Sequence, residues 1–251
     1  MKKYFINFLT SSIVALMSVS MLTSCSSSDD KNDDDGVSTA PITLGAGDQT
    51  VIVGAKTISV ANEFVAYVTK DNSVMAFHIG KTDLTVNGKK NIELTVTPKY
   101  TLYDDPVTNW GCDQAYVKSN QKQGSLSPKS TSDNLIYTDA GRSKAIMYTF
   151  ENGKLKSIGA VVSTSYTKEY ASYLAERYMM LPYEKENQTY FIGADALTKE
   201  QAKTVVVLQV YDYLNLIAVY VPVKDYNKTR GVSDLNELIE SAKKKYKAIV
   251  W

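Results

Sequence analysis

The chain has 251 residues, 44% of them hydrophobic, and its 28 basic and 27 acidic residues leave a formal net charge of +1. This near balance gives no electrostatic reason to expect nucleic acid or an anionic lipid surface as a partner. One histidine and two cysteines are too few for a zinc site built from several His or Cys ligands, and too few for a framework of disulfides.

The first 24 residues have the three zones of a secretory signal peptide. Lys2 and Lys3 form the charged start, and residues 6–21 form an apolar stretch that is too short and too rich in Ser and Thr for a membrane span. The next four residues, Leu22-Thr23-Ser24-Cys25, resemble the lipobox of bacterial lipoproteins. The resemblance implies cleavage before Cys25 and lipid attachment to its thiol. The alternative is a plain signal peptide followed by an ordinary cysteine.

Residues 25–40 are predicted to be a disordered acidic tether. Residues 26–36 include no apolar side chain and therefore cannot contribute to a core. Three serines followed by Asp29 and Asp30 resemble the surface-export signal of lipoproteins from the Bacteroidetes, which implies an outer-membrane protein displayed on the cell surface. The alternative is a flexible spacer that faces the periplasm. Removing the leader leaves 26 basic and 27 acidic residues, a net charge of −1. Because this charge gives no electrostatic attraction to a membrane, the attached lipid is predicted to be the membrane anchor.

Residues 41–104 are predicted to form a β-rich domain, either a β-meander or a small sandwich. Met75, Phe77 and Ile79 alternate with their neighbours and share one face of a strand at residues 73–79. His78 lies in the same strand, where a lone histidine is expected to be solvated. Further strands are expected at residues 50–53, 57–60, 63–69, 83–86 and 92–97, with turns at Val53-Gly54, Asp71-Asn72 and Asn87-Gly88.

Residues 105–251 are predicted to form an α+β domain of two α-β-β units. Each unit has a helix followed by a hairpin, and together the units form a mostly antiparallel sheet with helices on one side. The first unit has a helix at residues 112–121, a loop at 123–133, and strands at 135–138, 145–151 and 155–163, the last two joined by Asn152-Gly153. The second has a helix at residues 168–180 ended by Pro182, and strands at 189–193, 204–211 and 216–223. A last helix is capped by Ser233, and its apolar stripe has to lie on a sheet.

The first of these units has motifs of its own. Trp110-Gly111 is followed by Val117, and later by Tyr148-Thr149-Phe150 and Gly153-Lys154-Leu155. This pattern resembles the helix-plus-hairpin modules of small outer-membrane assembly lipoproteins and of the β-lactamase inhibitor protein, and is similar to many uncharacterised lipoproteins from gut Bacteroidetes. The resemblance implies a scaffold or assembly role in an outer-membrane complex. The Gly-x-Pro that ends the first helix in the assembly lipoproteins is missing here.

The sequence has none of the common catalytic motifs. It has no Gly-x-Ser-x-Gly turn and no phosphate-binding P-loop. Nucleophilic catalysis needs a base beside the nucleophile, and the only histidine lies in an alternating strand. We therefore expect no catalytic residue, cofactor or metal. Asp104, Asp105 and Asp195 lie near aromatic residues and are expected at the solvated surface. A pair of such carboxylates keeps a glycan hydrolase open as an alternative. Cys112 is expected to be a small core residue.

Tyrosine is unusually frequent, with 18 residues, of which all but three occur from Tyr103 onward. Tyrosines in predicted helices and strands are expected in the core, whereas Tyr103, Trp110 and Tyr183 lie in predicted loops and are the candidate ligand-binding residues. The leading hypothesis is therefore a non-enzymatic envelope lipoprotein that binds a protein or carbohydrate partner.

Overall fold

The computed structural model describes residues 36–185, 188–198 and 200–228, and within them 45% of the residues lie in strands and 12% in helices. The fold class is α+β, as predicted, with a lower helix content than expected. The described chain divides into two compact units, residues 36–100 with 172–177, and residues 101–171 with those from 178 onward. The predicted signal peptide, Cys25, Asp29 and Asp30, and the helix expected from Ser233 lie outside the described residues.

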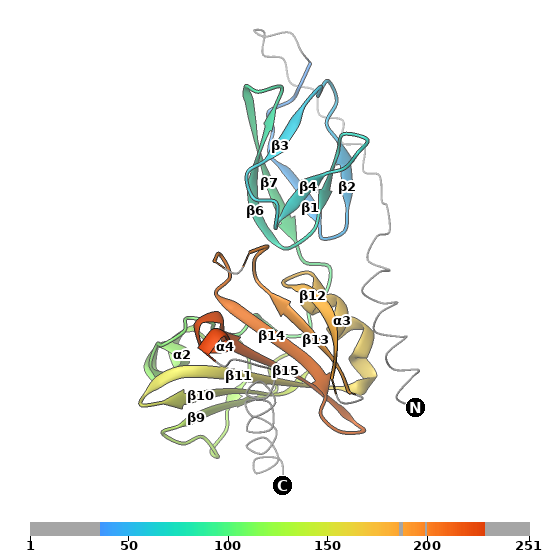
Figure 1. The fold of residues 1–251 in the computed structure, drawn as a ribbon. Helices are drawn as coiled ribbons and strands as arrows, with labels where there is room; N and C mark the ends of the chain where they lie inside the picture. Colours follow the sequence, from blue (N-terminus) through green and yellow to red (C-terminus); the bar gives the residue numbers. More distant parts are fainter. Residues whose placement is uncertain (1–35, 186–187, 199, 229–251) are drawn as a thin grey trace. The chain divides into compact units, whose positions relative to one another are not determined.

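The N-terminal unit is a small β-sandwich. One sheet has the order β1-β7-β6-β3 and the other the order β2-β5-β4 (Figure 1). All neighbouring strands are antiparallel except β1 and β7, which are parallel. The strands are β1 (Ile42–Gly45), β2 (Gln49–Val51), β3 (Ile58–Val60), β4 (Ala66–Val68), β5 (Ser73–Ala76), β6 (Gly80–Val86) and β7 (Lys90–Thr97).

Alternation along the strands builds the core of this sandwich. In β7, Ile92, Leu94 and Val96 are buried while the residues between them are exposed or half-buried. They join one apolar cluster with Val74 and Ala76 of the opposite sheet. Because successive side chains of a strand point to opposite faces, each sheet contributes every second residue to the layer between the two sheets.

The C-terminal unit is built on one eight-stranded antiparallel sheet with the order β12-β13-β14-β15-β11-β10-β9-β8. Its strands are β8 (Ser125–Leu126), β9 (Asn134–Thr138), β10 (Ser143–Glu151), β11 (Lys154–Ser163), β12 (Met179–Lys185), β13 (Gln188–Ala194), β14 (Thr204–Val210) and β15 (Asn215–Pro222). The helices are α2 (Gln114–Asn120), the 3₁₀ turn η1 (Thr164–Tyr166), α3 (Thr167–Ala175) and α4 (Val223–Lys228).

Local sequence signals explain several of these elements. Asn152 and Gly153 both have positive φ angles, +51° and +71°, so they form the tight turn that pairs Glu151 with Lys154. The side chain of Asp113 accepts a hydrogen bond from the backbone N–H of Tyr116 at 2.8 Å and caps α2. The predicted hairpin and first helix are therefore confirmed.

The second predicted helix is partly wrong, because α3 ends at Ala175 and residues 179–185 form β12. The apolar residues that continue the helical spacing belong to a strand in which Met180 is buried and Leu181 is exposed. Pro182 fits there because β12 is the edge of the described sheet, where a residue without an N–H costs little.

The expected solvation of His78 is also wrong, since the side chain is fully buried. Its Nδ1 lies 2.6 Å from the carbonyl oxygen of Phe64, and the two rings stack at 3.9 Å between centroids. A backbone partner and an aromatic neighbour together make the imidazole a core residue of the sandwich.

Candidate functional site

The turn between β14 and β15 exposes large apolar side chains. Tyr213 is 93% exposed and Leu214 is 67% exposed, and Val210 at the end of β14 is 42% exposed. Polar residues are the usual occupants of such a turn, because they remain solvated there. A tyrosine and a leucine at its tip therefore need an explanation.

Hydrogen bonds fix this turn from both sides. Asp212 Oδ1 accepts from the backbone N–H of Leu214 at 2.8 Å and from Asn215 Nδ2 at 2.9 Å. The N–H of Tyr211 donates to the carbonyl of Asn215 at 2.9 Å, and the N–H of Thr164 donates to the carbonyl of Leu214 at 2.9 Å. The two exposed side chains are thus held on a defined backbone.

Strand register brings other aromatic residues to the same end of the sheet. Ser163 pairs with Asn215, so η1 follows directly beside the turn, and the guanidinium of Arg142 lies 5.2 Å from the ring centroid of Tyr166 in η1. On the other side, β12 ends and β13 begins at this end, with Tyr183 opposite Tyr190. We call Arg142, Tyr166, Tyr183, Tyr213 and Leu214 the tyrosine-rich end.

The expectation that Tyr103 is exposed is wrong, because only 3% of this residue is accessible. Its hydroxyl donates to the hydroxyl of Tyr170 at 3.0 Å and lies 2.9 Å from that of Tyr220. The hydroxyl of Tyr170 in turn donates to the carbonyl of Ala160 at 3.0 Å. Burial raises the pKa of Tyr170 well above its ordinary value, so its hydroxyl stays neutral and can donate this bond. Tyr103 is a core residue because other tyrosines satisfy its polar atom.

The other two predicted ligand-binding residues lie apart from each other. Trp110 is half-buried, and its Nε1 donates to Thr204 Oγ1 at 3.1 Å, at the start of β14. Tyr183 is 36% exposed but lies in β12 rather than in a loop. Along the strands, it lies toward the end of the sheet opposite to that of Trp110. The structure therefore does not bring Tyr103, Trp110 and Tyr183 together, and only Tyr183 belongs to the tyrosine-rich end.

Sequence reasoning missed Tyr213 and Leu214. The signal was available, because Asp212 and Asn215 are typical turn residues and they enclose an apolar pair between two long apolar strands. An apolar pair inside a turn indicates side chains that cannot both point into the core.

The candidate carboxylates have internal partners. Asp104 Oδ1 accepts from Gln123 Nε2 at 2.9 Å, and Asp195 Oδ1 accepts from the backbone N–H groups of Lys203 and Thr204 at 2.8 and 3.0 Å. Asp105 is exposed. Asp104 therefore connects its loop to the segment after α2, and Asp195 closes the loop before β14.

Cys112 is half-buried, which raises the pKa of its thiol, and it forms no disulfide with another described residue. Within residues 36–185, 188–198 and 200–228, no group of three or more His, Cys, Asp or Glu side chains is placed to hold a metal ion. No helix in the described part of the chain is long and apolar enough to cross a membrane.

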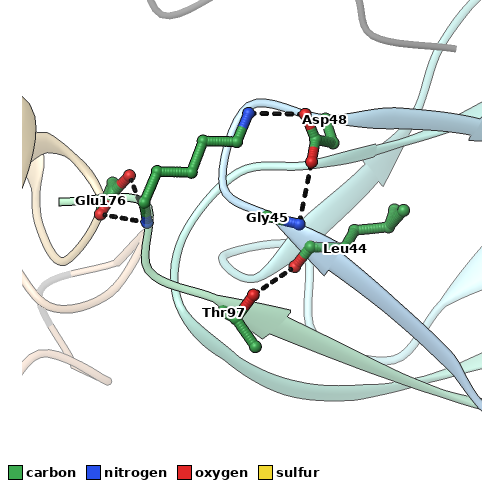
Figure 2. A network of polar contacts seen from close by, with 6 residues as sticks. Leu44, Gly45, Asp48, Thr97 and Glu176 are labelled. Atoms are coloured by element: carbon green, nitrogen blue, oxygen red, sulfur yellow. Dashed lines mark hydrogen bonds and ion pairs between the residues drawn. The ribbon is translucent and has the colours of Figure 1, made fainter. Parts of the chain in front are cut away.

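Figure 2 shows a polar network of the sandwich unit that includes the buried side chains of Glu176 and Asp48. Glu176 is 1% exposed, and its carboxylate accepts from the backbone N–H groups of Lys99 and Tyr100, both at 3.1 Å. The Nζ of Lys99 lies 2.5 Å from Asp48 Oδ1, and Asp48 Oδ2 accepts from the N–H of Gly45 at 3.0 Å. Burial raises the pKa of the Glu176 carboxyl. Both acids bind backbone donors, so the network acts as a structural clamp.

No protein-family model matches this chain, and the search of curated proteins finds no match either.

Proposed function

We propose that the chain is a non-enzymatic, lipid-anchored lipoprotein of the outer membrane, displayed on the cell surface, that binds a partner through the tyrosine-rich end. The observation that carries this proposal is the fixed β14–β15 turn with Tyr213 and Leu214 exposed. Removing side chains of this size from water contributes about 1.5–3 kcal/mol each when they are fully buried. The turn therefore offers a partner a favourable contact that these side chains do not make with the described part of the chain.

The alternatives have no comparable support. A glycan hydrolase needs two carboxylates beside the scissile bond, whereas the carboxylate of Asp104 binds the side chain of Gln123 and that of Asp195 binds the backbone of Lys203. The assembly-factor alternative rests only on the resemblance between the helix-and-hairpin pattern of this chain and that of assembly lipoproteins. A shared fold is compatible with many functions. A binding role needs only the exposed surface that the turn provides.

Anchoring is tested by fractionating cells that express the full chain. Cys25→Ala should leave the protein unprocessed or release it into soluble fractions, and Cys112→Ala should leave its membrane association unchanged. A Cys25→Ala protein of normal mature mass in the membrane fraction would overturn the lipobox interpretation. Replacing Asp29 and Asp30 with Ala should lower protease accessibility on intact cells. Unchanged accessibility would make that stretch a spacer.

Binding is tested with the lipidated protein immobilised from detergent. The two probes are an outer-membrane protein extract and the surface polysaccharide, each from the cells that produce the chain. Retention of either probe should fall with Tyr213→Ala and persist with Tyr116→Ala, because Tyr116 is 43% exposed on α2, away from the turn. If neither probe is retained, the binding function is wrong.

A further inference from the structure

The shape of the tyrosine-rich end restricts the class of ligand. The tip of the β14–β15 hairpin is at the lower right of Figure 1. Val210 and Leu216 are its last paired residues, and Tyr213 and Leu214 follow in the connecting turn. Sites for small molecules are concave and enclose most of their ligand. A hairpin tip is convex, so it suits a partner that supplies the concave surface itself.

The residue types at this end are those that anchor protein interfaces. Tyrosine and arginine are enriched at the energetic centres of such interfaces, where an aromatic anchor fills a pocket and is shielded from water. Tyr213 is almost entirely accessible, and Leu214 adds an aliphatic neighbour. Because hydrogen bonds from Thr164 and to Asp212 already fix the turn, binding would order little additional backbone.

Charge adds a second requirement on the partner. Arg142 is exposed and its guanidinium stacks over Tyr166, two residues after Thr164, which binds the turn. In contrast, the Asp212 carboxylate accepts from Leu214 and Asn215 and is directed into the turn. Arg142 therefore places an exposed positive charge at this end, and an acidic group on the partner would complement it.

We propose that the β14–β15 turn docks into an apolar recess of a partner protein, with Tyr213 and Leu214 as the inserted side chains and Arg142 facing an acidic residue at the rim. This inference rests on the proposed function and makes it specific, since it selects a protein over a free carbohydrate. It also selects a protein over a lipid bilayer, because polar residues lie beside the apolar tip: Asp212 in the turn itself, and Thr164 and Ser165 in η1, which binds the turn.

The test places a photoreactive phenylalanine analogue at position 213 of the full-length lipoprotein in its own cells, with position 116 as the matched control. The crosslinked protein is then purified and titrated against the detergent-solubilised lipoprotein. Tyr213→Ala should weaken the measured Kd by about 10- to 30-fold, as expected for an interface anchor. Tyr116→Ala should change it by less than about twofold. Arg142→Glu should weaken binding more at low salt than at high salt.

Several results would overturn the inference. These are crosslinks from position 213 to lipid alone, retention of polysaccharide but not protein by the immobilised chain, or an identified partner whose Kd does not change with Tyr213→Ala. In the last case the chain still binds, so the binding function survives, while the tyrosine-rich end is wrong as its site. If no probe is retained at all, both fail. Tyr213 is solvent-exposed, and an unchanged melting temperature of Tyr213→Ala would show that lost binding is not lost folding.

Discussion

The buried carboxylate of Glu176 accepts a hydrogen bond from the backbone N–H of Lys99, 77 residues earlier in the chain. Figure 2 shows both carboxylate oxygens directed at this N–H. The same carboxylate accepts from the N–H of Tyr100, so one side chain satisfies two backbone donors just after β7. Glu176→Ala should lower the free energy of unfolding of the sandwich unit by about 2–4 kcal/mol, because buried donors lose their acceptor. Faster hydrogen exchange of the β6 and β7 amides would report the loss. Glu63→Ala, at an exposed position of the same unit, is the control and should change exchange little.

The same residue should make stability depend on pH. Burial raises the pKa of Glu176 above its ordinary value of 4.5, so between these two values the folded chain binds more protons than the unfolded chain. The free energy of unfolding contributed by this group therefore falls as pH rises from about 4.5 through the raised pKa. Glu176→Gln does not titrate and should show a flatter profile in urea unfolding over this window. Equal slopes for both proteins would show that another group titrates there.

Alternation predicted strands such as β7 because they are half-buried, although it left a β-meander and a small sandwich as alternatives. Ile92, Leu94 and Val96 point into the core while their neighbours face solvent, and this period of two is visible in the sequence. Asn152-Gly153 predicted the hairpin of β10 and β11 for an equally local reason, since few other residue pairs accept two positive φ angles. Features set by neighbouring residues could therefore be predicted.

Features set by distant residues could not be predicted from the sequence. Residues 178–181 continue the helical spacing of α3, yet pairing of Met180 and Leu181 with β13 makes this segment a strand. His78 and Tyr103 were expected in solvent, and each is buried because a distant partner satisfies its polar atom. No local pattern shows those partners, because they come from segments far along the chain.

The candidate surface was predicted only in part. Tyr183 was identified from its position beside Pro182, and it remains exposed. Tyr213 was overlooked because tyrosines next to strands are common in cores. Its exposure follows from the tightness of the turn between Val210 and Leu216, and that depends on how β14 and β15 pair.

Tyr103→Phe separates a core role from a ligand-binding role. The substitution keeps the ring and removes the hydroxyl that Tyr170 and Tyr220 contact. We expect the free energy of unfolding of the C-terminal unit to fall by about 1–2 kcal/mol. Urea unfolding followed by the fluorescence of Trp110, which lies in this unit, measures the change. Tyr213→Phe is the matched control at an exposed position and should change stability by less than about 0.5 kcal/mol. Equal stability of the two variants would mean that the hydroxyl cluster contributes nothing.

Two glycines of the eight-stranded sheet should respond oppositely to the same substitution. A Cβ at Gly193 would lie 3.0 Å from the Cβ of Tyr178 and closer still to the sulfur of Met180, whereas a Cβ at Gly159 would meet its nearest neighbour, Ile217, at 3.7 Å. The methionine tip can move, but the Tyr178 Cβ moves only with its backbone. Gly193→Ala should therefore lower the free energy of unfolding by about 1–3 kcal/mol, the usual effect of overpacking. Gly159→Ala should be neutral or slightly stabilising, because alanine restricts the unfolded chain more than glycine does. The same Trp110 fluorescence measurement compares them, and a loss at Gly159 as large as that at Gly193 would contradict the packing described for β11 and β13.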